Sequence, residues 1–223
     1  LGILDAVECP PTFRTDPKMF QGIIAGGYDA LVRSIECAED SMEEGAKIVA
    51  SSITNKDMVV GISASSSTPF VLGALEEAKN KGAFTGLIIC NKPPNLVNVD
   101  QIISIIVGPE VITGSTRMKA GTATKLILNM ISTTVMVKLN KTYGNLMIDL
   151  KISNNKLNDR GVRIISQITN ESYKSSYKLL IGAKGNVKIA IVMSLLNLNF
   201  KDSKEILTAH KGKIRTILNL KEK

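Results

Sequence analysis

Short apolar runs alternate with amphipathic stretches along most of the first 150 residues. Residues 58–63 form an apolar run typical of a buried strand, and the apolar spacing over residues 70–81 predicts a helix. Gly82 ends this helix, and the apolar run at residues 84–90 predicts a second strand. A strand, a helix and a strand in this order predict a parallel sheet.

The same periodicity predicts further elements on both sides of this unit. In chain order they are a strand at 21–25 ended by Gly26 and Gly27, helices at 29–38 and 43–53, a strand at 102–107 and a long helix at 117–139. Because strands and helices alternate, we predict a three-layer α/β/α domain with an open parallel sheet over residues 1–153.

The pattern changes after residue 154. Short amphipathic helices are predicted at 157–168, 172–181, 187–195 and 202–218. Gly182 and Gly185 separate two of these helices, which favours a small bundle of about 65 residues. We therefore predict a separate C-terminal helical domain over residues 154–223.

Composition narrows the classes of protein that the chain can represent. Hydrophobic residues make up 44% and charged residues 22%, which is typical of a globular protein. No run approaches the roughly 18 to 20 apolar residues of a membrane helix, since even residues 126–139 contain Asn129 and Lys138. The first residues show no basic segment before a long apolar one, so no signal peptide is expected. We expect a cytoplasmic protein with no membrane partner.

The cysteine and histidine content argues against metal and triad chemistry. Cys9, Cys37 and Cys90 are too few and too scattered to predict a disulfide framework or a zinc site, and they fit a reducing cytoplasm. His210 is the only histidine, which argues against a His-dependent catalytic triad or a His-rich metal site. We expect neither a metal ion nor another cofactor.

The net charge of +8 is concentrated in the C-terminal third. Residues 151–223 hold 15 Lys and Arg against 5 Asp and Glu, a balance of +10 that leaves −2 for the first 150 residues. The segment contains only Tyr173, Tyr177 and Phe200 as aromatics and no RNA or DNA motif, so no nucleic-acid partner is expected. Solvated lysines on small helices explain the charge, and the positive field could also help to attract a phosphorylated substrate.

A serine-rich turn between the strand at 58–63 and the next helix is the first candidate phosphate site. Its hydroxyl residues are Ser63, Ser65, Ser66, Ser67 and Thr68. Backbone N–H groups and hydroxyls at a helix N-terminus attract anions, and Pro69 suits the first helical turn. The alternative is that Thr68 only caps the helix.

The second candidate is the glycine-containing loop at residues 114–122. Ser115, Thr116, Arg117 and Lys119 place hydroxyls and two cations at the start of a long helix. The alternative is a capped helix with a surface arginine and lysine. Because strand ends in an open parallel sheet converge on one crevice, both loops could line a single pocket.

Several stretches, taken together, resemble the N-acetylmuramic acid 6-phosphate etherases of the sugar isomerase domain superfamily. They are LGILDAVECPPTF from residue 1, GIIAGG from 22, ECAED from 36, VVGISASSSTPFVLGALEEAK from 59, GPEVITGSTRMKAGTATKLILNMIST from 108, YGNLMIDLKISNNKL from 143 and GNVKIAIVMSLLN from 185. The GSTRMKAGTA signature is shared with the related glucokinase regulatory proteins.

This resemblance implies a fold, an assembly and a reaction. It implies a sugar isomerase domain, a C-terminal domain resembling a ubiquitin-associated bundle, and a homodimer. The implied substrate is N-acetylmuramic acid 6-phosphate, a phosphorylated amino sugar. The implied reaction cleaves its D-lactyl ether with water, giving N-acetylglucosamine 6-phosphate and D-lactate during cell-wall sugar recycling.

Glu8 is the first candidate catalytic residue. It ends a short apolar helical segment just before Cys9, Pro10 and Pro11, which are expected to terminate the helix. A carboxylate at a helix C-terminus faces the negative end of the dipole, which favours its protonated form and suits a general acid. The alternative is a solvated glutamate. The resemblance implies that the family's proton donor falls on Glu8.

Glu39 is the second candidate, within an acidic cluster. The cluster contains Glu36, Glu39, Asp40, Glu43 and Glu44, and most such clusters are solvated faces. The residues themselves do not single out one carboxylate. The resemblance implies Glu39, acting as the base at C2 of the sugar or as the residue that activates water.

The chain departs from the family pattern in ways that leave other functions open. It is expected to be truncated at its N-terminus, because it begins after the place of the family's first Gly/Ser/Thr-rich loop. Ser66 and Ser67 stand where the family has glycine and arginine, and Tyr28 stands where a glutamate is usual. The alternatives are a non-catalytic sugar-phosphate-binding regulator, an etherase that has lost turnover, and an aldose–ketose isomerase on the same fold.

Overall fold

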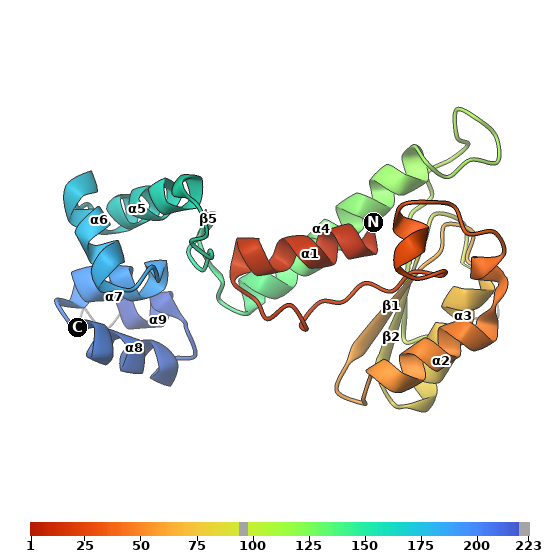
Figure 1. The fold of residues 1–223 in the computed structure, drawn as a ribbon, viewed down its shortest axis with the longest axis horizontal. Coiled ribbons are helices and arrows are strands. Elements are labelled where there is room, and N and C mark those ends of the chain that lie inside the picture. Colours follow the sequence, from red (N-terminus) through yellow and green to blue (C-terminus); the bar gives the residue numbers. More distant parts are fainter. Residues whose placement is uncertain (94–97, 219–223) are drawn as a thin grey trace. The chain divides into compact units, whose positions relative to one another are not determined.

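The computed structural model describes residues 1–93 and 98–218 and divides the chain into two compact units (Figure 1). Unit 1 consists of Leu1–Leu4 and Gly22–Asn129, and unit 2 consists of Asp5–Gln21 and Met130–Lys223. Two helices, α1 (Gly2–Phe13) and α4 (Lys119–Lys138), belong partly to each unit. The predicted domain boundary between residues 153 and 154 stays a prediction.

Unit 1 is built on a three-stranded parallel sheet in the order β1-β2-β3. Its elements are α2 (Met42–Ser52), β1 (Met58–Ile62), α3 (Pro69–Asn80), β2 (Phe84–Ile89), β3 (Gln101–Ser104) and the first half of α4, with short 3₁₀ turns at Tyr28–Leu31 and Ala38–Asp40. Val60 pairs with Gly86, which pairs in turn with Gln101. The predicted α/β class, parallel sheet and β1-α3-β2 unit are confirmed.

The helix α3 is held tightly between the sheet and α2. Leu75 of α3 packs with Leu87 and Ile89 of β2 in a buried cluster. On its other side, a Cβ atom on Gly73 would lie 2.0 Å from the carbonyl oxygen of Met42, so only glycine allows this approach to α2. The close packing fixes the position of α3, whose N-terminus follows the serine-rich turn.

Two elements predicted upstream of α2 do not form. Residues 21–25 are not a strand, because Gly22 packs against the backbone of Ile3, where an added Cβ would lie 2.7 Å from the Ile3 Cα. The helix predicted at 29–38 is reduced to the turn at Tyr28–Leu31. Tyr28 and Val32 are 80% and 74% exposed, so this segment buries no apolar stripe that could stabilise a longer helix.

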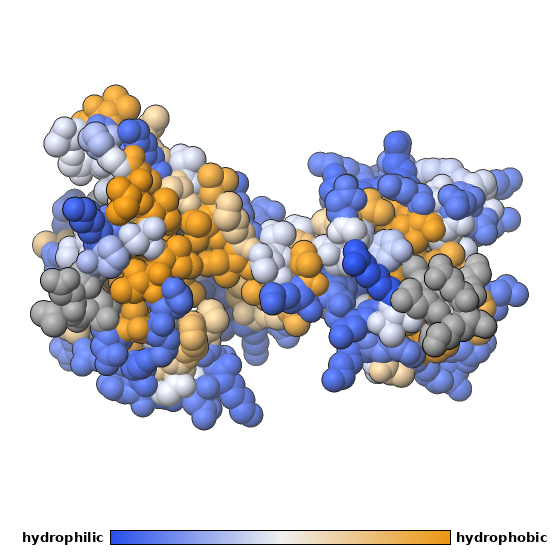
Figure 2. All heavy atoms as spheres, turned by 180° about the vertical axis from the view of Figure 1, so that it is seen from behind, coloured by the Kyte–Doolittle hydropathy of each residue, from blue (hydrophilic) through white to orange (hydrophobic). Residues whose placement is uncertain are grey.

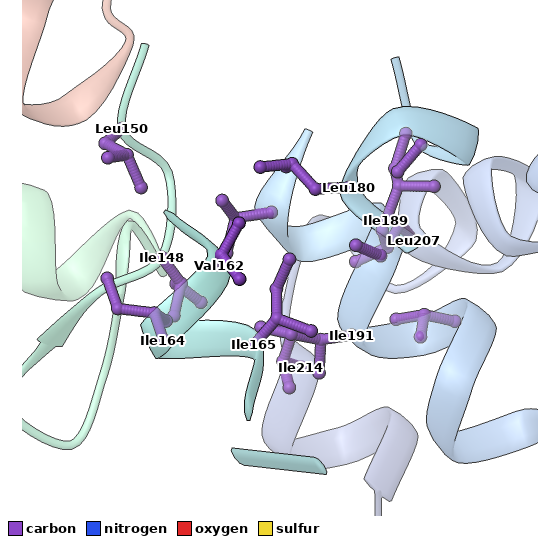
Figure 3. Close-up of a cluster of buried hydrophobic side chains, with 14 of the residues drawn as sticks. Ile148, Leu150, Val162, Ile164, Ile165, Leu180, Ile189, Ile191, Leu207 and Ile214 are labelled. Atoms are coloured by element: carbon purple, nitrogen blue, oxygen red, sulfur yellow. The ribbon is translucent and has the colours of Figure 1, made fainter. Parts of the chain in front are cut away.

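Unit 2 contains a bundle of short helices around one apolar core (Figure 3). Its elements are the hairpin strands β4 (Thr142–Tyr143) and β5 (Leu146–Met147), then α5 (Asn155–Thr169), α6 (Tyr173–Gly182), α7 (Val187–Leu196), α8 (Phe200–Ala209) and α9 (Ile214–Leu218). The predicted C-terminal helical region is confirmed. The single helix predicted at 202–218 is wrong, because Lys211 and Gly212 have φ values of 51° and 72° and separate α8 from α9.

The hairpin is tied to α7 by a buried ion-pair network. Lys188 of α7 is 8% exposed, and its Nζ lies 3.1 Å from Oδ2 of Asp149. Lys141 lies 2.8 Å from the same oxygen. Burial lowers the pKa of Lys188, and the Asp149 carboxylate opposes this shift.

No single helix among the described residues is long and apolar enough to cross a membrane. Only when α6 and α7 are taken together do they reach the length and apolar content of a membrane span, and the two helices are bent by 112° at the break between them.

Candidate functional site

The carboxyl ends of the parallel strands bring the two candidate phosphate loops together. Ser63 follows β1, and its N–H donates to the carbonyl of Ile88 at 3.1 Å. Cys90 follows β2 and contacts both loops. Its N–H donates to the carbonyl of Ala64 at 3.1 Å, and its thiol lies 3.6 Å from the carbonyl oxygen of Ala120 at the start of α4. Both loops therefore reach the carboxyl edge of the sheet within unit 1, and the single pocket that they could line stays a prediction.

The hydroxyl groups of the serine-rich turn form one hydrogen-bonded cluster. Buried Ser63 lies 2.8 Å from Thr68, Oγ to Oγ1, and 3.5 Å from the hydroxyl of Ser65. Ser65 in turn lies 2.9 Å from Ser67, Oγ to Oγ, and accepts from its N–H at 3.3 Å. Four of the five predicted residues are thus joined through their side chains.

In the described part of the chain, α3 has no side-chain cap, and the Thr68 hydroxyl contacts Ser63 instead. The alternative that Thr68 only caps α3 is therefore wrong. Side chains do cap other helices, with Ser41 on α2, Asn154 on α5, Ser172 on α6, Asn186 on α7 and Asn199 on α8. Pro69 has no N–H, and the N–H groups of Val71 and Leu72 donate to the carbonyl of Thr68, each at 3.1 Å. In the first turn of α3 this leaves the N–H of Phe70 for an anion, which the helix dipole also attracts.

Ser66 adopts a backbone conformation that favours glycine, with φ at 69°. We expect Ser66→Gly to raise the free energy of unfolding by about 0.5 to 1 kcal/mol, because glycine adopts this conformation without strain. Chemical denaturation measures the change. Ser65→Gly is the matched control, since Ser65 is not in this conformation and glycine there removes hydroxyl contacts. An equal gain in both variants, or a loss in Ser66→Gly, would contradict strain at Ser66.

The second candidate loop, at residues 114–122, differs from the prediction in where its helix begins and in what caps that helix. The helix α4 begins at Lys119, two residues later than predicted, and its first amide groups are already bonded to a carboxylate. Oε2 of Glu110 accepts from the N–H of Lys119 at 3.1 Å, and Oε1 accepts from the N–H of Ala120 at 3.0 Å. The Lys119 ammonium donates to the carbonyl of Pro109 at 2.8 Å. These contacts occupy the first two amide groups of α4, whereas at α3 the described structure leaves the Phe70 N–H beside the hydroxyl cluster.

The remaining loop residues lie at the surface. Thr116 and Arg117 are exposed and Ser115 is half-buried. The N–H of Arg117 donates to the Ser115 hydroxyl at 3.3 Å. Their hydroxyls and guanidinium group are placed next to the start of α4, where they could contact a ligand phosphate or sugar hydroxyl.

Glu8 is exposed on α1, in the part that belongs to unit 2. The prediction that Pro10 and Pro11 end this helix is wrong, because both lie inside it and their fixed φ is compatible with helical geometry. Glu8 therefore precedes the last helical turn, and the argument from the helix C-terminus does not apply to it. Next to it, burial raises the pKa of the Cys9 thiol, which donates to the carbonyl of Asp5 at 3.4 Å.

Glu39 is exposed in the 3₁₀ turn at Ala38–Asp40 of unit 1. This turn packs against α3 and follows Cys37, whose φ is 59°. The structure divides the acidic cluster, since Glu43 and Glu44 lie in the first turn of α2. Glu39 is thus set apart from them, next to the helix that carries the serine-rich turn. The joint action of Glu39 and Glu8 stays a prediction.

A hollow at the amino ends of β1 and β2 has a structural role. Its lining includes Asp57, Lys79 and Asp100. Asp100 pairs with Lys79 and accepts from the N–H and the hydroxyl of Thr85, each at 2.8 Å. These partners, Lys79 foremost, lower the pKa of Asp100 to about 2. The polar groups are satisfied by one another and hold β2 to the segment before β3.

Two family models match separate parts of the chain. Residues 1–79 match the family described as the glucokinase regulatory protein N-terminal SIS domain, where SIS denotes sugar isomerase. Residues 144–184 match the C-terminal lid domain of glucokinase regulatory protein.

Comparisons over most of the chain give relatives that share one name. The chain is 54% identical over 196 residues to an N-acetylmuramic acid 6-phosphate etherase of Clostridium acetobutylicum, covering 86% of this chain and 65% of that protein. Etherases of Crocosphaera subtropica and Caldanaerobacter subterraneus are 52% and 53% identical, again over 86% of this chain and 64% of theirs. The chain thus spans a little under two thirds of these relatives. The predicted resemblance is confirmed, and the chain is a relative of these etherases.

Proposed function

We propose that the protein cleaves the D-lactyl ether of N-acetylmuramic acid 6-phosphate, giving N-acetylglucosamine 6-phosphate and D-lactate. The observation that carries this proposal is the hydroxyl cluster at the uncapped N-terminus of α3, joined to the start of α4 around Cys90. Hydroxyl groups and a helix N-terminus at the carboxyl edge of a parallel sheet suit the binding of a sugar phosphate. The identity to etherases selects the reaction. The same activity would give the protein a role in cell-wall amino-sugar recycling.

Direct cleavage of an alkyl ether is slow, because alkoxide is a poor leaving group. Opening of the sugar ring exposes a C1 aldehyde, which acidifies the proton on C2. Glu39 removes this proton, the bond between C3 and the ether oxygen breaks, and Glu8 protonates the departing lactate oxygen. Water then adds to C3 of the unsaturated aldehyde while a proton returns to C2. The sum is substrate plus water to the two products.

Other residues would bind the substrate. The N–H of Phe70 at the start of α3 and the hydroxyls of Ser63, Ser65, Ser67 and Thr68 would hold the phosphate, since helix N-termini and hydroxyl donors suit an anion. Ser66 would contribute through the turn that its backbone forms. Ser115, Thr116 and Arg117 would contact the remaining ligand oxygens, and the Lys119 ammonium, bonded to Pro109, would mainly hold their loop.

The test of the proposal is the release of D-lactate, measured enzymatically, from N-acetylmuramic acid 6-phosphate. The assay uses the chain alone and a fusion that adds the part of the Clostridium acetobutylicum relative left outside the match. Release by either protein supports the etherase. Binding of N-acetylglucosamine 6-phosphate without release would favour a sugar-phosphate-binding regulator or an etherase that has lost turnover. Formation of a ketose phosphate would favour an isomerase.

The serine-rich turn gives a direct test of the phosphate site. Ser67→Ala and Thr68→Ala should each raise the dissociation constant for N-acetylglucosamine 6-phosphate about tenfold or more, because hydrogen bonds to a charged group contribute about 1.5 to 3 kcal/mol. Isothermal titration calorimetry measures the change. Ser51→Ala, at an exposed serine of α2, is the control. Unchanged affinity in both variants would place the phosphate elsewhere.

The cellular setting follows from the same proposal. We propose a cytoplasmic homodimer that binds neither membrane nor nucleic acid and needs no metal ion or other cofactor. Cys9, Cys37 and Cys90 are free thiols, which suits a reducing compartment. The homodimer rests on the resemblance to the etherase family.

A further inference from the structure

The loop that carries Ser115 and Arg117 is closed at its base by Glu110. The Glu110 carboxylate accepts from two successive amide groups, those of Lys119 and Ala120, at 3.1 and 3.0 Å. From the other side, the Lys119 ammonium donates to the carbonyl of Pro109 at 2.8 Å. These three hydrogen bonds join residues nine or ten apart, and we refer to them as the Glu110 clamp.

Apolar burial does little to hold the same loop. Val111 is 81% exposed, Ile112 is 71% exposed and Met118 is 58% exposed. Hydrophobic residues also reach the surface elsewhere, as Figure 2 shows for one face of the molecule. The loop's internal hydrogen bonds are local, such as the N–H of Ser115 to the carbonyl of Ile112 at 3.1 Å. The end of the loop is joined to α4 by the N–H groups of Gly121 and Thr122, which donate to the carbonyls of Thr116 and Met118 at 3.0 and 2.9 Å. The Glu110 clamp adds the hydrogen bonds that join the beginning of the loop, at Pro109 and Glu110, to the start of α4.

The clamp also decides where an anion can bind. A carboxylate at the start of α4 already uses the amide groups and the dipole that a ligand phosphate would need. The backbone hydrogen bonds from Ala120 and Lys119 lower the pKa of Glu110, so the carboxylate stays charged at neutral pH and repels a second anion. A phosphate is thereby directed to α3, which has no side-chain cap in the described structure.

We propose that Glu110 is a positioning residue of the sugar-phosphate site, because its clamp fixes the loop that presents Ser115, Thr116 and Arg117 to the ligand. This inference rests on the proposed function. Glu110 itself contacts no ligand in this account. The residues next to Glu110 in the sequence do not indicate this role, because the carboxylate bonds to amide groups nine and ten positions away.

Hydrogen exchange and calorimetry on the chain test the inference separately from activity. In Glu110→Ala, the amide groups of Lys119 and Ala120 should exchange about tenfold faster or more, because they lose their acceptor. The dissociation constant for N-acetylglucosamine 6-phosphate should rise about tenfold. Glu110→Gln, with one carbonyl acceptor in place of two oxygens, should be intermediate in both measurements. Glu76→Ala, at an exposed glutamate of α3, is the control.

The results that would contradict the inference each contradict one step of it. Unchanged exchange at Lys119 and Ala120 would show that the clamp does not form. Faster exchange with unchanged affinity would show that the loop does not position the ligand, and faster exchange throughout α5 to α8 would assign Glu110 to general stability. If the unaltered chain and the fusion both fail to bind the sugar phosphate, the proposed function fails, while the exchange result still decides whether the clamp exists.

Discussion

Glu8→Gln is expected to lower D-lactate release by about 10²- to 10⁴-fold, because the amide keeps the shape of the side chain but cannot donate the proton that lactate needs to depart. Removal of the C2 proton comes earlier in the sequence and does not require Glu8. Solvent deuterium should therefore still enter recovered substrate at C2. Mass spectrometry of substrate from reactions stopped in D₂O measures this exchange.

A matched control separates the role of Glu8 from a general charge effect. Glu205→Gln removes an exposed carboxylate from α8 of the same unit and should leave lactate release unchanged. Normal release by Glu8→Gln would remove Glu8 from the mechanism. Loss of both release and C2 exchange, with ligand affinity retained, would instead make Glu8 the base.

Glu39→Gln should abolish both lactate release and deuterium exchange at C2, because no base remains to remove the proton. Affinity for N-acetylglucosamine 6-phosphate should change little, since the glutamine keeps the size of the side chain. The same D₂O experiment measures both reactions. The contrast with Glu8→Gln is the feature that assigns the two carboxylates to different steps.

The acidic cluster supplies the controls for Glu39. Glu43 lies in the first turn of α2, and Glu43→Gln should leave turnover unchanged. Glu36 accepts a hydrogen bond from Ser34 at 3.3 Å, and Glu36→Gln should likewise have little effect. Normal turnover in Glu39→Gln together with loss in Glu36→Gln would move the base to Glu36.

Periodicity predicted the elements whose apolar residues are buried. The strand and helix pattern of residues 58–90 gives β1, α3 and β2. All three elements contribute apolar residues to one core, so the positions of these residues along the chain follow the period of each element. Residues 21–25 are as apolar as a strand, yet Gly22 packs against the backbone of Ile3 instead of pairing in a ladder. An apolar run indicates that a segment is buried, but it does not indicate which part of the fold the segment packs against.

The ends of two helices also differ from the prediction. Pro10 and Pro11 normally end a helix, but α1 continues through both to Phe13. The break between α8 and α9 at Gly212 was open to prediction, because glycine favours the left-handed conformation found there.

For the site, the sequence located the two loops but not the way they are held. Ser63, Ser65, Ser67 and Thr68 come together because they share one short turn after a strand. The carboxylate of Glu110 bonds to amide groups nine and ten residues away, and no spacing rule predicts such a contact. Cys90, predicted only as a thiol without a disulfide, is the residue that joins both loops.

The central claim is that the ether is cleaved between C3 and oxygen by elimination, followed by addition of water. The most direct test is mass spectrometry of both products formed from N-acetylmuramic acid 6-phosphate in water labelled with ¹⁸O, using the chain and the fusion. The account predicts one ¹⁸O atom at C3 of N-acetylglucosamine 6-phosphate and none in D-lactate, because lactate keeps the ether oxygen. Label in lactate with an unlabelled C3 oxygen in the sugar, or no lactate from either protein, would contradict it.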